Sequence, residues 1–348
     1  MASIDRRVPH RLLRPFAGEA VIPPPIWLMR QAGRYLPEYR ALRAKAGSFL
    51  ELCYNPALAA EAALQPVRRY GFDAAIVFSD ILVVPDALGQ AVAFSEGEGP
   101  RLQPIRSATD LACLRPAATE AKFARVCEAV ARLRQDLPEG TALIGFCGAP
   151  WTVASYMVEG RGSPDQAQAR LWAYRDPAGF ARLVELLIDT SIAYLCAQID
   201  AGADVLQIFD TWAGALPDLE FARWVVAPTQ RIVAGVRRRH PEVPIIGFPR
   251  GAGSRIAGYV EATGVHGIGC DTALPLVDMA ALAARLVVQG NIDPLVVAAG
   301  GLPCEAVVAR LLEAMRGRPF ICNLGHGIRP ETPPEHVARL VALVRANR

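Results

Sequence analysis

The segment ALIGFCGAPWT, residues 142–152, begins with a short apolar run and ends in a turn that contains glycine and proline. Short continuous apolar runs between amphipathic segments are typical of parallel strands buried on both faces. The same pattern recurs along the chain at 26–29, 74–78, 142–146, 205–209, 244–248, 264–269, 287–290 and 320–323. These runs predict eight buried parallel strands.

The segments between the apolar runs have helical spacing. They span 57–70, 120–135, 180–201, 219–239, 254–262, 278–285 and 305–315. Two of them reach a glycine at their end, in Tyr70-Gly71 and Ala201-Gly202, which is a frequent helix stop signal. Eight strands alternating with helices predict an α/β protein, a (β/α)8 TIM barrel with loops inserted at its C-terminal face. The alternative is a doubly wound open sheet, although no GxGxxG motif follows the first run.

Length and hydrophobicity indicate a globular protein. Of the 348 residues, 52% are hydrophobic, and the mean hydropathy is +0.22. These values exclude an intrinsically disordered chain. We expect residues 1–20 to form an N-terminal tail and residues 21–348 to form one barrel domain. No run of eighteen uncharged apolar residues occurs and no apolar signal core lies near the start, so we expect neither a membrane span nor secretion.

Charge and cysteine content narrow the classes of partner. A formal net charge of +3 does not by itself indicate a nucleic-acid partner. The eight cysteines are scattered without a CxxC pair, which predicts reduced thiols and a cytoplasmic location. The one arrangement resembling a zinc site combines His266 and Cys270 with Cys304 or Cys322, and we treat it as a minor alternative. No metal, P-loop or dinucleotide motif is present, so we expect no metal and no cofactor.

Polar residues follow nearly every apolar run, where a barrel places its reactive groups. The acidic ones are Asp80, Asp210, Asp271 and Asp293. Arg30 directly follows Trp-Leu-Met without a turn residue between them, so ordinary turn composition does not account for it. A charged guanidinium at a barrel mouth requires an anionic partner.

Arginines are concentrated after the first run, in PIWLMRQAGRYLPEYR (residues 25–40) and the residues just beyond it. Arg30, Arg34 and Arg43 would bring several guanidinium groups to one cavity, and such groups bind carboxylates or phosphates bidentately. One strand-end acid, which we take to be Asp80, must then be free to hold a cation or an N–H donor. The residues alone therefore predict a polyanionic small-molecule substrate with an N–H-bearing centre. We interpret Arg40 as an ordinary helix-face residue.

A nucleophilic cysteine is a further alternative. Cys147 and His326 both follow predicted strands and have the residue types of a Cys–His pair. However, Cys147 continues an apolar run and lacks a recognisable nucleophile turn, so we treat the pair as a minor hypothesis. Of the five histidines, His326, which lies between two glycines after the last run, is the strongest functional candidate.

Five motifs, in this order, resemble the uroporphyrinogen decarboxylase family. They are the stretch 25–40, FSDILVVPDALG at 78–89, GFCGAPWT at 145–152 with YMVEG at 156–160, QGNIDP at 289–294 and NLGHGI at 323–328. The resemblance extends from about residue 22 to near the C-terminus. It implies a (β/α)8 barrel, usually a homodimer, that works without a cofactor in the tetrapyrrole pathway to haem. The implied reaction removes the four acetate carboxyls of uroporphyrinogen III as CO2 and gives coproporphyrinogen III.

The resemblance also implies residue roles. It makes Asp80, Arg30 and Tyr156 catalytic, with an ionised Asp80 facing the pyrrole N–H groups and stabilising a protonated pyrrole. The implied substrate-binding residues are Arg30, Arg34, Arg43, Asp80, Phe146, Tyr156, Phe209, Thr211 and His326. The proton donor stays open among Arg30, Tyr156, His326 and a carboxylate or water held by an arginine.

Two positions depart from the family pattern. Thr211 stands where some members carry serine, and Trp212 stands where some carry histidine. Related zinc-dependent methyltransferases use a His-x-Cys motif with a distant cysteine, whereas this chain has His-x-x-x-Cys. A zinc- or corrinoid-dependent methyltransferase on the same barrel is therefore disfavoured, and a non-catalytic porphyrinogen-binding protein is the other alternative.

Overall fold

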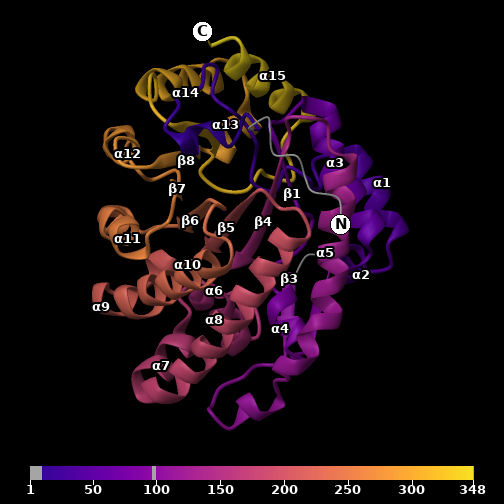
Figure 1. Cartoon of the computed structure of the whole chain (residues 1–348), viewed down its shortest axis with the longest axis vertical. Helices are drawn as coiled ribbons and strands as arrows, with labels where there is room; N and C mark the ends of the chain where they lie inside the picture. The colour runs from indigo at the N-terminus through magenta and orange to yellow at the C-terminus, as the bar shows by residue number, and fades with distance from the viewer. Residues whose placement is uncertain (1–9, 96–98, 348) are drawn as a thin grey trace.

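The computed structural model describes residues 10–95 and 99–347, and its centre is a curled parallel sheet of seven strands. The strands are β1 (Ala74–Ile76), β4 (Ala142–Gly148), β5 (Val205–Asp210), β6 (Ile245–Pro249), β7 (Gly267–Gly269), β8 (Val287–Ile292) and β9 (Phe320–Leu324). Their spatial order follows the chain order, because each strand pairs with the next. Seven of the eight predicted runs are thus confirmed as strands. Figure 1 shows these strands at the centre, with helices around them.

The first apolar run does not form the regular strand that we predicted. Ile26 makes one parallel bridge, to Cys322 of β9, and the Cys322 N–H donates to the Pro25 carbonyl at 2.8 Å. On the other side, the Asp73 N–H donates to the Ile26 carbonyl at 2.9 Å, just before β1. The Ile26 N–H donates to a side chain, the Asp73 carboxylate, at 2.7 Å. Side-chain acceptors therefore replace the regular ladder here, and the run is not counted as an eighth strand.

All seven predicted helical segments are helical, within a few residues of the expected ends. The α-helices are α1 (Pro37–Lys45), α2 (Phe49–Tyr54), α3 (Pro56–Tyr70), α4 (Val83–Ala87), α5 (Thr119–Asp136), α6 (Pro150–Glu159), α7 (Ala167–Arg175), α8 (Pro177–Asp200), α9 (Asp218–Phe221), α10 (Ala227–Arg239), α11 (Ile256–Thr263), α12 (Leu276–Ala283), α13 (Pro294–Ala299), α14 (Gly301–Ala314) and α15 (Pro334–Arg345). A π-helical turn, η5 (Ala222–Val226), joins α9 to α10. The 3-10 turns are η1 (Arg14–Ala17), η2 (Asp110–Cys113), η3 (Pro116–Ala118), η4 (Ala213–Ala215) and η6 (Gly253–Arg255).

Several helices that we did not predict begin with proline. In α6, α13 and α15 the proline lies in the first turn, at Pro150, Pro294 and Pro334. Proline suits that position because its missing N–H would have no partner inside the helix. The antiparallel hairpin of β2 (Val92–Ser95) and β3 (Gly99–Leu102) was also unexpected, and it lies between α4 and α5. Within the described residues, no helix is long and apolar enough to cross a membrane.

The core has two parts, and the smaller one fills the inside of the curled sheet. Its buried members come from nearly every strand: Leu12, Trp27, Met29, Ala74, Ala142, Ile144, Val205, Ile246, Phe248, Val287 and Ile321. Such filling is typical of barrel interiors, which are packed cores rather than pores. Leu12, from the expected N-terminal tail, is fully buried in this cluster. Residues 1–9 of that expected tail lie outside the described residues.

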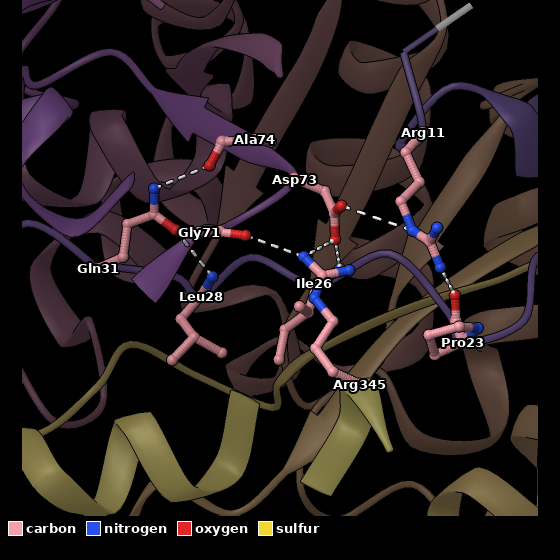
Figure 2. Close-up of polar contacts among 9 residues, drawn as sticks. All are labelled: Arg11, Pro23, Ile26, Leu28, Gln31, Gly71, Asp73, Ala74 and Arg345. Carbon is pink, nitrogen blue, oxygen red and sulfur yellow. Dashed lines mark hydrogen bonds and ion pairs between the residues drawn. The ribbon is translucent and has the colours of Figure 1, made fainter. Parts of the chain in front are cut away.

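The N-terminal edge of the sheet is held by Asp73, whose exposed fraction is 8%. Figure 2 shows its carboxylate between Arg11, Arg345 and the Ile26 backbone. Asp73 lies 3.5 Å from Arg11 Nε and 2.9 Å from Arg345 Nη2. Arg11 also donates to the Pro23 carbonyl, and Arg345 donates to the Gly71 carbonyl at 2.9 Å. This Asp73 cluster ties the N-terminal segment and α15 to the start of β1.

Candidate active site

Four of the predicted site residues meet at the carboxyl edge of the sheet. Arg30 follows the bridge segment, Asp80 follows β1, Tyr156 lies in α6, and His326 follows β9. The positive charge of Arg30 acts to lower the pKa of each of the other three side chains. Because exposed charges more than about 10 Å apart are largely screened, these groups belong to one site. The structure thus brings together residues that lie far apart in the sequence.

Asp80 is the acidic centre of this site. Its Oδ1 accepts a hydrogen bond from the Leu82 N–H at 2.8 Å, and no other group among the described residues donates to its carboxylate. Burial raises the pKa of Asp80 above its ordinary range, while the Leu82 N–H and the charge of Arg30 act in the opposite direction. An isolated carboxylate with a free oxygen is suited to bind an N–H donor or a cation.

Two other strand-end acids accept hydrogen bonds from backbone N–H groups. Asp271 accepts from the Gly251 N–H at 2.6 Å and from the Ala273 N–H at 2.8 Å. Asp293 caps α13 by accepting from the Leu295 N–H. Asp293 is exposed to solvent, whereas Asp80 is half-buried and has an oxygen without a partner among the described residues, so Asp80 is the acid best suited to hold a ligand.

Asp210 is buried below the site and is held by α6. The Thr152 hydroxyl donates to Asp210 Oδ1, and Asp210 Oδ2 has no partner among the described residues. Burial raises the pKa of Asp210 to about 7, although the bond from Thr152 opposes the shift. Thr152 also accepts from the Trp212 N–H at 3.2 Å, so this buried pair fixes the loop after β5.

Aromatic rings form the walls beside the polar groups. Tyr156 stacks on Trp212, with ring centroids 4.2 Å apart. Phe146 meets Phe209 edge to face at 5.6 Å, and Phe209 also contacts Phe248 at 6.1 Å. Burial raises the pKa of Tyr156, and the charge of Asp80 raises it further. Tyr156 is therefore a neutral hydrogen-bonding group that is placed by an aromatic neighbour.

The loop after β5 also supplies Thr211, which is half-buried and directly precedes Trp212. Trp212 stands where some family members carry histidine, and its indole packs on the ring of Tyr156.

His326 is held in its neutral form. Burial lowers the pKa of His326 to about 4, and the charges of Arg30, Arg250 and Arg329 lower it further. A neutral imidazole can donate or accept a hydrogen bond, but it cannot serve as an imidazolium acid near pH 7. In this structure His326 is therefore a neutral hydrogen-bonding group.

Arg250 is a site residue that we did not predict. It is exposed and directly follows β6, at the carboxyl edge of the sheet, which we call the mouth. From there its positive charge acts to lower the pKa of His326. Its position after a strand is the sequence signal that points to it. That signal is obscured because Pro249 and Gly251 on either side are typical of an ordinary turn.

Arg34 and Arg43 approach the same edge from the α1 region. Both positive charges act to lower the pKa of Tyr39. The ring of Tyr39 packs on Phe78, with ring centroids 5.5 Å apart. Phe78 is two residues before Asp80, so these arginines lie on the β1 side of the mouth. Arg40 instead donates to the Arg34 carbonyl and is exposed, which agrees with its interpretation as a helix-face residue.

The mouth contains arginines without acidic partners. Within residues 10–95 and 99–347, Arg30, Arg34, Arg43 and Arg250 form no ion pair. Guanidinium groups stay charged at all physiological pH values and bind carboxylates in pairs of hydrogen bonds. The site can therefore bind a ligand with several carboxylates.

The structure does not support the cysteine alternatives. Burial raises the pKa of Cys147 to about 12, and its thiol faces Ser191 of α8, outside the sheet. It is thus a poor nucleophile. In the part of the chain that the structure describes, no group of three or more His, Cys, Asp or Glu side chains is placed to hold a metal ion. The zinc ligands suggested around His266 are not assembled, and its Nδ1 accepts from the Ile245 N–H.

Fold and site together define an α/β protein that carries, within the described residues, unpaired arginines around Asp80 at the carboxyl edge of a parallel sheet. Comparison with known proteins then gives the family. The family model described as "Uroporphyrinogen decarboxylase (URO-D)" matches residues 8–347. The chain therefore belongs to the uroporphyrinogen decarboxylase family.

Similar proteins match this chain over nearly its full length. The uroporphyrinogen decarboxylase of Rhodospirillum rubrum is 55% identical over 98% of this chain and 99% of its own. That of Sinorhizobium fredii is 56% identical over 97% and 98%. Among solved structures, a methyltransferase from Methanosarcina mazei matches with a TM-score of 0.76 over 96% of this chain and 97% of its own. At 23% identity that likeness shows the fold alone.

Proposed function

We propose that this chain decarboxylates the four acetate side chains of uroporphyrinogen III, giving coproporphyrinogen III and CO2 in tetrapyrrole biosynthesis. Its relatives in the family carry the name of this activity. The observation that carries the proposal is a half-buried acid with an unpaired oxygen, Asp80, near arginines that form no ion pair within the described residues, namely Arg30, Arg34, Arg43 and Arg250. A substrate with eight carboxylates and four inward N–H groups is complementary to that arrangement.

The chemistry requires a place for the electrons of the broken bond. When the bond between the acetate carbon and its carboxyl breaks, CO2 leaves and its bonding electrons must enter the ring. Protonation of a ring carbon makes the pyrrole a cation that accepts them and leaves an exocyclic methylene once CO2 has gone. A second proton then completes the methyl group, and the ring carbon releases the first proton to restore the pyrrole, so that one proton is consumed for each CO2. The carboxylate of Asp80 would stabilise this cation through its N–H groups in a partly buried site of low effective dielectric.

The arginines and the aromatic walls would position the macrocycle. Arg30, Arg34 and Arg43, with Arg250 across the mouth, would bind carboxylates, while Phe146 and Phe209 would contact the rings. Since His326 is neutral, we assign it a hydrogen-bonding role. The first proton would then come from Tyr156, from Arg30, or from a carboxyl group or water held by an arginine.

We also propose that the curled sheet is a closed (β/α)8 barrel. Residues 25–29 would occupy the eighth strand position between β9 and β1. The bridge from Ile26 to Cys322 and the bond from Asp73 to Ile26 support this closure. In this proposal residues 21–348 form one domain, and residues 1–20 form an N-terminal extension, of which Leu12 packs inside the sheet.

A homodimer in the cytoplasm completes the proposal. All eight cysteines are free thiols, which suits a reducing compartment. Large apolar side chains that are exposed, such as Leu219, Val277 and Leu302, are available for a subunit contact. Light scattering coupled to gel filtration would give twice the chain mass for a dimer and the chain mass for a monomer.

The decisive experiment is anaerobic conversion of uroporphyrinogen III, with chromatography of the products. The wild-type chain should give coproporphyrinogen, and Asp80→Asn should lose at least about 100-fold in kcat because the charge on the developing cation is lost. Asp189→Asn, at an exposed acid on α8, is the matched control and should be fully active. Absence of coproporphyrinogen with wild type would refute the function. Near-normal turnover by Asp80→Asn would refute only the role of Asp80.

A further inference from the structure

Arg30 occupies a backbone conformation that arginine rarely adopts. Its φ is 61°, in the left-handed region, and the Gln31 N–H donates to the Leu28 carbonyl at 3.0 Å. Residues 28–31 therefore form a tight turn with Arg30 at the third position, where a positive φ favours glycine or asparagine. Strained conformations of this kind persist only where the surroundings enforce them, and they are concentrated at functional sites.

Two buried amide side chains enforce this turn. Gln31 accepts from the Leu28 N–H at 3.1 Å and donates to the Ala74 carbonyl of β1 at 3.0 Å, as Figure 2 shows. On the other side, Asn323 of β9 accepts from the Met29 N–H at 3.0 Å. The exposed fractions of Gln31 and Asn323 are 1% and 0%. The backbone on both sides of Arg30 is thus anchored to a neighbouring strand.

The arginine side chain lies directly on a glycine. A Cβ at Gly327 would be 2.4 Å from Arg30 Cδ, 2.7 Å from its Cγ and 3.0 Å from its Nε. The backbone of Gly327 is not in the left-handed region, so no conformational requirement excludes alanine there. The neighbouring Ile328 N–H donates to the Met29 carbonyl at 2.9 Å, which keeps this loop against the turn. The missing side chain at 327 leaves the space that the stem of Arg30 fills.

We infer that Gly327, Gln31 and Asn323 are positioning residues that fix Arg30 in one pose at the mouth. A guanidinium that is already oriented loses less conformational entropy when it binds a carboxylate, and its fork meets the substrate at a defined angle. This inference rests on the proposed function, because it assigns Arg30 to the substrate. It predicts that a methyl group at residue 327 acts on catalysis through Arg30 alone.

The first test is Gly327→Ala. The methyl group should displace the guanidinium and lower kcat/KM about 10–100-fold, mainly through KM, because displacement by about 1 Å is sufficient for such losses. The melting temperature should change little, since the atoms that must move belong to an exposed side chain. Gly258→Ala in α11 is the matched control, because a Cβ there meets no atom within 4 Å and the backbone is not left-handed. The control should be fully active.

A double-mutant cycle separates positioning from a general disturbance. In an Arg30→Ala background, whose residual turnover is followed fluorimetrically at high enzyme concentration, Gly327→Ala should cost less than about twofold, because the atoms that it displaces are gone. An equal loss in both backgrounds, or no loss in either, would overturn the inference. Gln31→Met keeps the shape of the side chain and removes both of its hydrogen bonds. It therefore tests independently whether these bonds hold the turn at Arg30. It should raise KM more than it lowers kcat, and unchanged kinetics would contradict that part.

The outcomes distinguish this inference from the proposed function. If the wild-type chain fails to convert uroporphyrinogen III, the function itself is wrong. If wild type is active and Gly327→Ala equals it, only the positioning role is wrong.

Discussion

Both edges of the sheet carry arginines and an aspartate, but these groups are paired with one another at the N-terminal edge and, among the described residues, unpaired at the carboxyl edge. At the N-terminal edge, Arg11 and Arg345 are both within 4 Å of one buried acid, Asp73, which also accepts a backbone N–H. At the carboxyl edge, Arg30, Arg34, Arg43 and Arg250 have no acidic partner among the described residues, and Asp80 keeps an oxygen free. The paired edge closes the fold, whereas the unpaired edge is available to a ligand. In barrel folds this division between stability and function is general.

Replacing one arginine by alanine at each edge should lower activity at the carboxyl edge and stability at the N-terminal edge. Arg30→Ala should lower kcat/KM by about 100-fold or more, because loss of one partner of a hydrogen-bonded charge pair costs about 2–5 kcal/mol. Its melting temperature should stay near that of wild type. Arg345→Ala should lower the melting temperature and leave kcat/KM unchanged for the folded fraction. Steady-state kinetics and thermal unfolding of both variants measure these effects. If both variants lost activity and stability to the same extent, the two edges would not differ in role.

The acids should differ in the same way. Asp73→Ala leaves the Ile26 N–H and two arginines without their acceptor, so we expect it to lower the free energy of unfolding by about 3 kcal/mol. Asp80→Asn should not destabilise the protein at pH 7, because burial raises the pKa of Asp80 and its charge therefore opposes folding. Urea unfolding at pH 7 tests both. A loss of stability with Asp80→Asn equal to that of Asp73→Ala would show that Asp80 is structural.

Asp210 offers a test through pH. Its pKa rises from an ordinary value near 4 to about 7 on folding, so the folded chain binds an extra proton between these values. The free energy of unfolding should therefore fall as pH rises through this window, by up to about 1.4 kcal/mol per pH unit. Asp210→Asn should remove this contribution. Urea unfolding of both proteins from pH 4.5 to 7.5 gives the difference, and parallel profiles would contradict it.

The smallest expected effect concerns the backbone of Arg30. Both Arg30→Gly and Arg30→Ala remove the guanidinium, but only glycine adopts the left-handed conformation without strain. Arg30→Gly should therefore be more stable than Arg30→Ala by about 1 kcal/mol. Chemical unfolding of the two variants measures this difference. Equal stabilities would mean that the turn relaxes once the arginine is lost.

The sequence alone determined the repeating part of the fold. Seven of the eight apolar runs are strands, and all the segments with helical spacing are helices, because both patterns record burial along a local stretch of chain. It also placed Arg30, Asp80 and His326 at strand ends or just beyond them, whereas Tyr156, in α6, came from the family motifs. Family motifs then supplied the chemistry that these residue types allow.

Only the tertiary structure decided which groups are left without partners. Asp80, Asp271 and Asp293 look alike in sequence, yet Asp271 accepts from the Gly251 N–H of another loop, Asp293 is exposed, and Asp80 is half-buried with an oxygen that has no partner in the described part of the chain. The lowered pKa of His326 likewise depends on burial and on arginines from other loops. The left-handed turn at Arg30 depends on β1 and β9. Hydrogen bonds and charges act across space, so their partners are fixed only when distant segments meet.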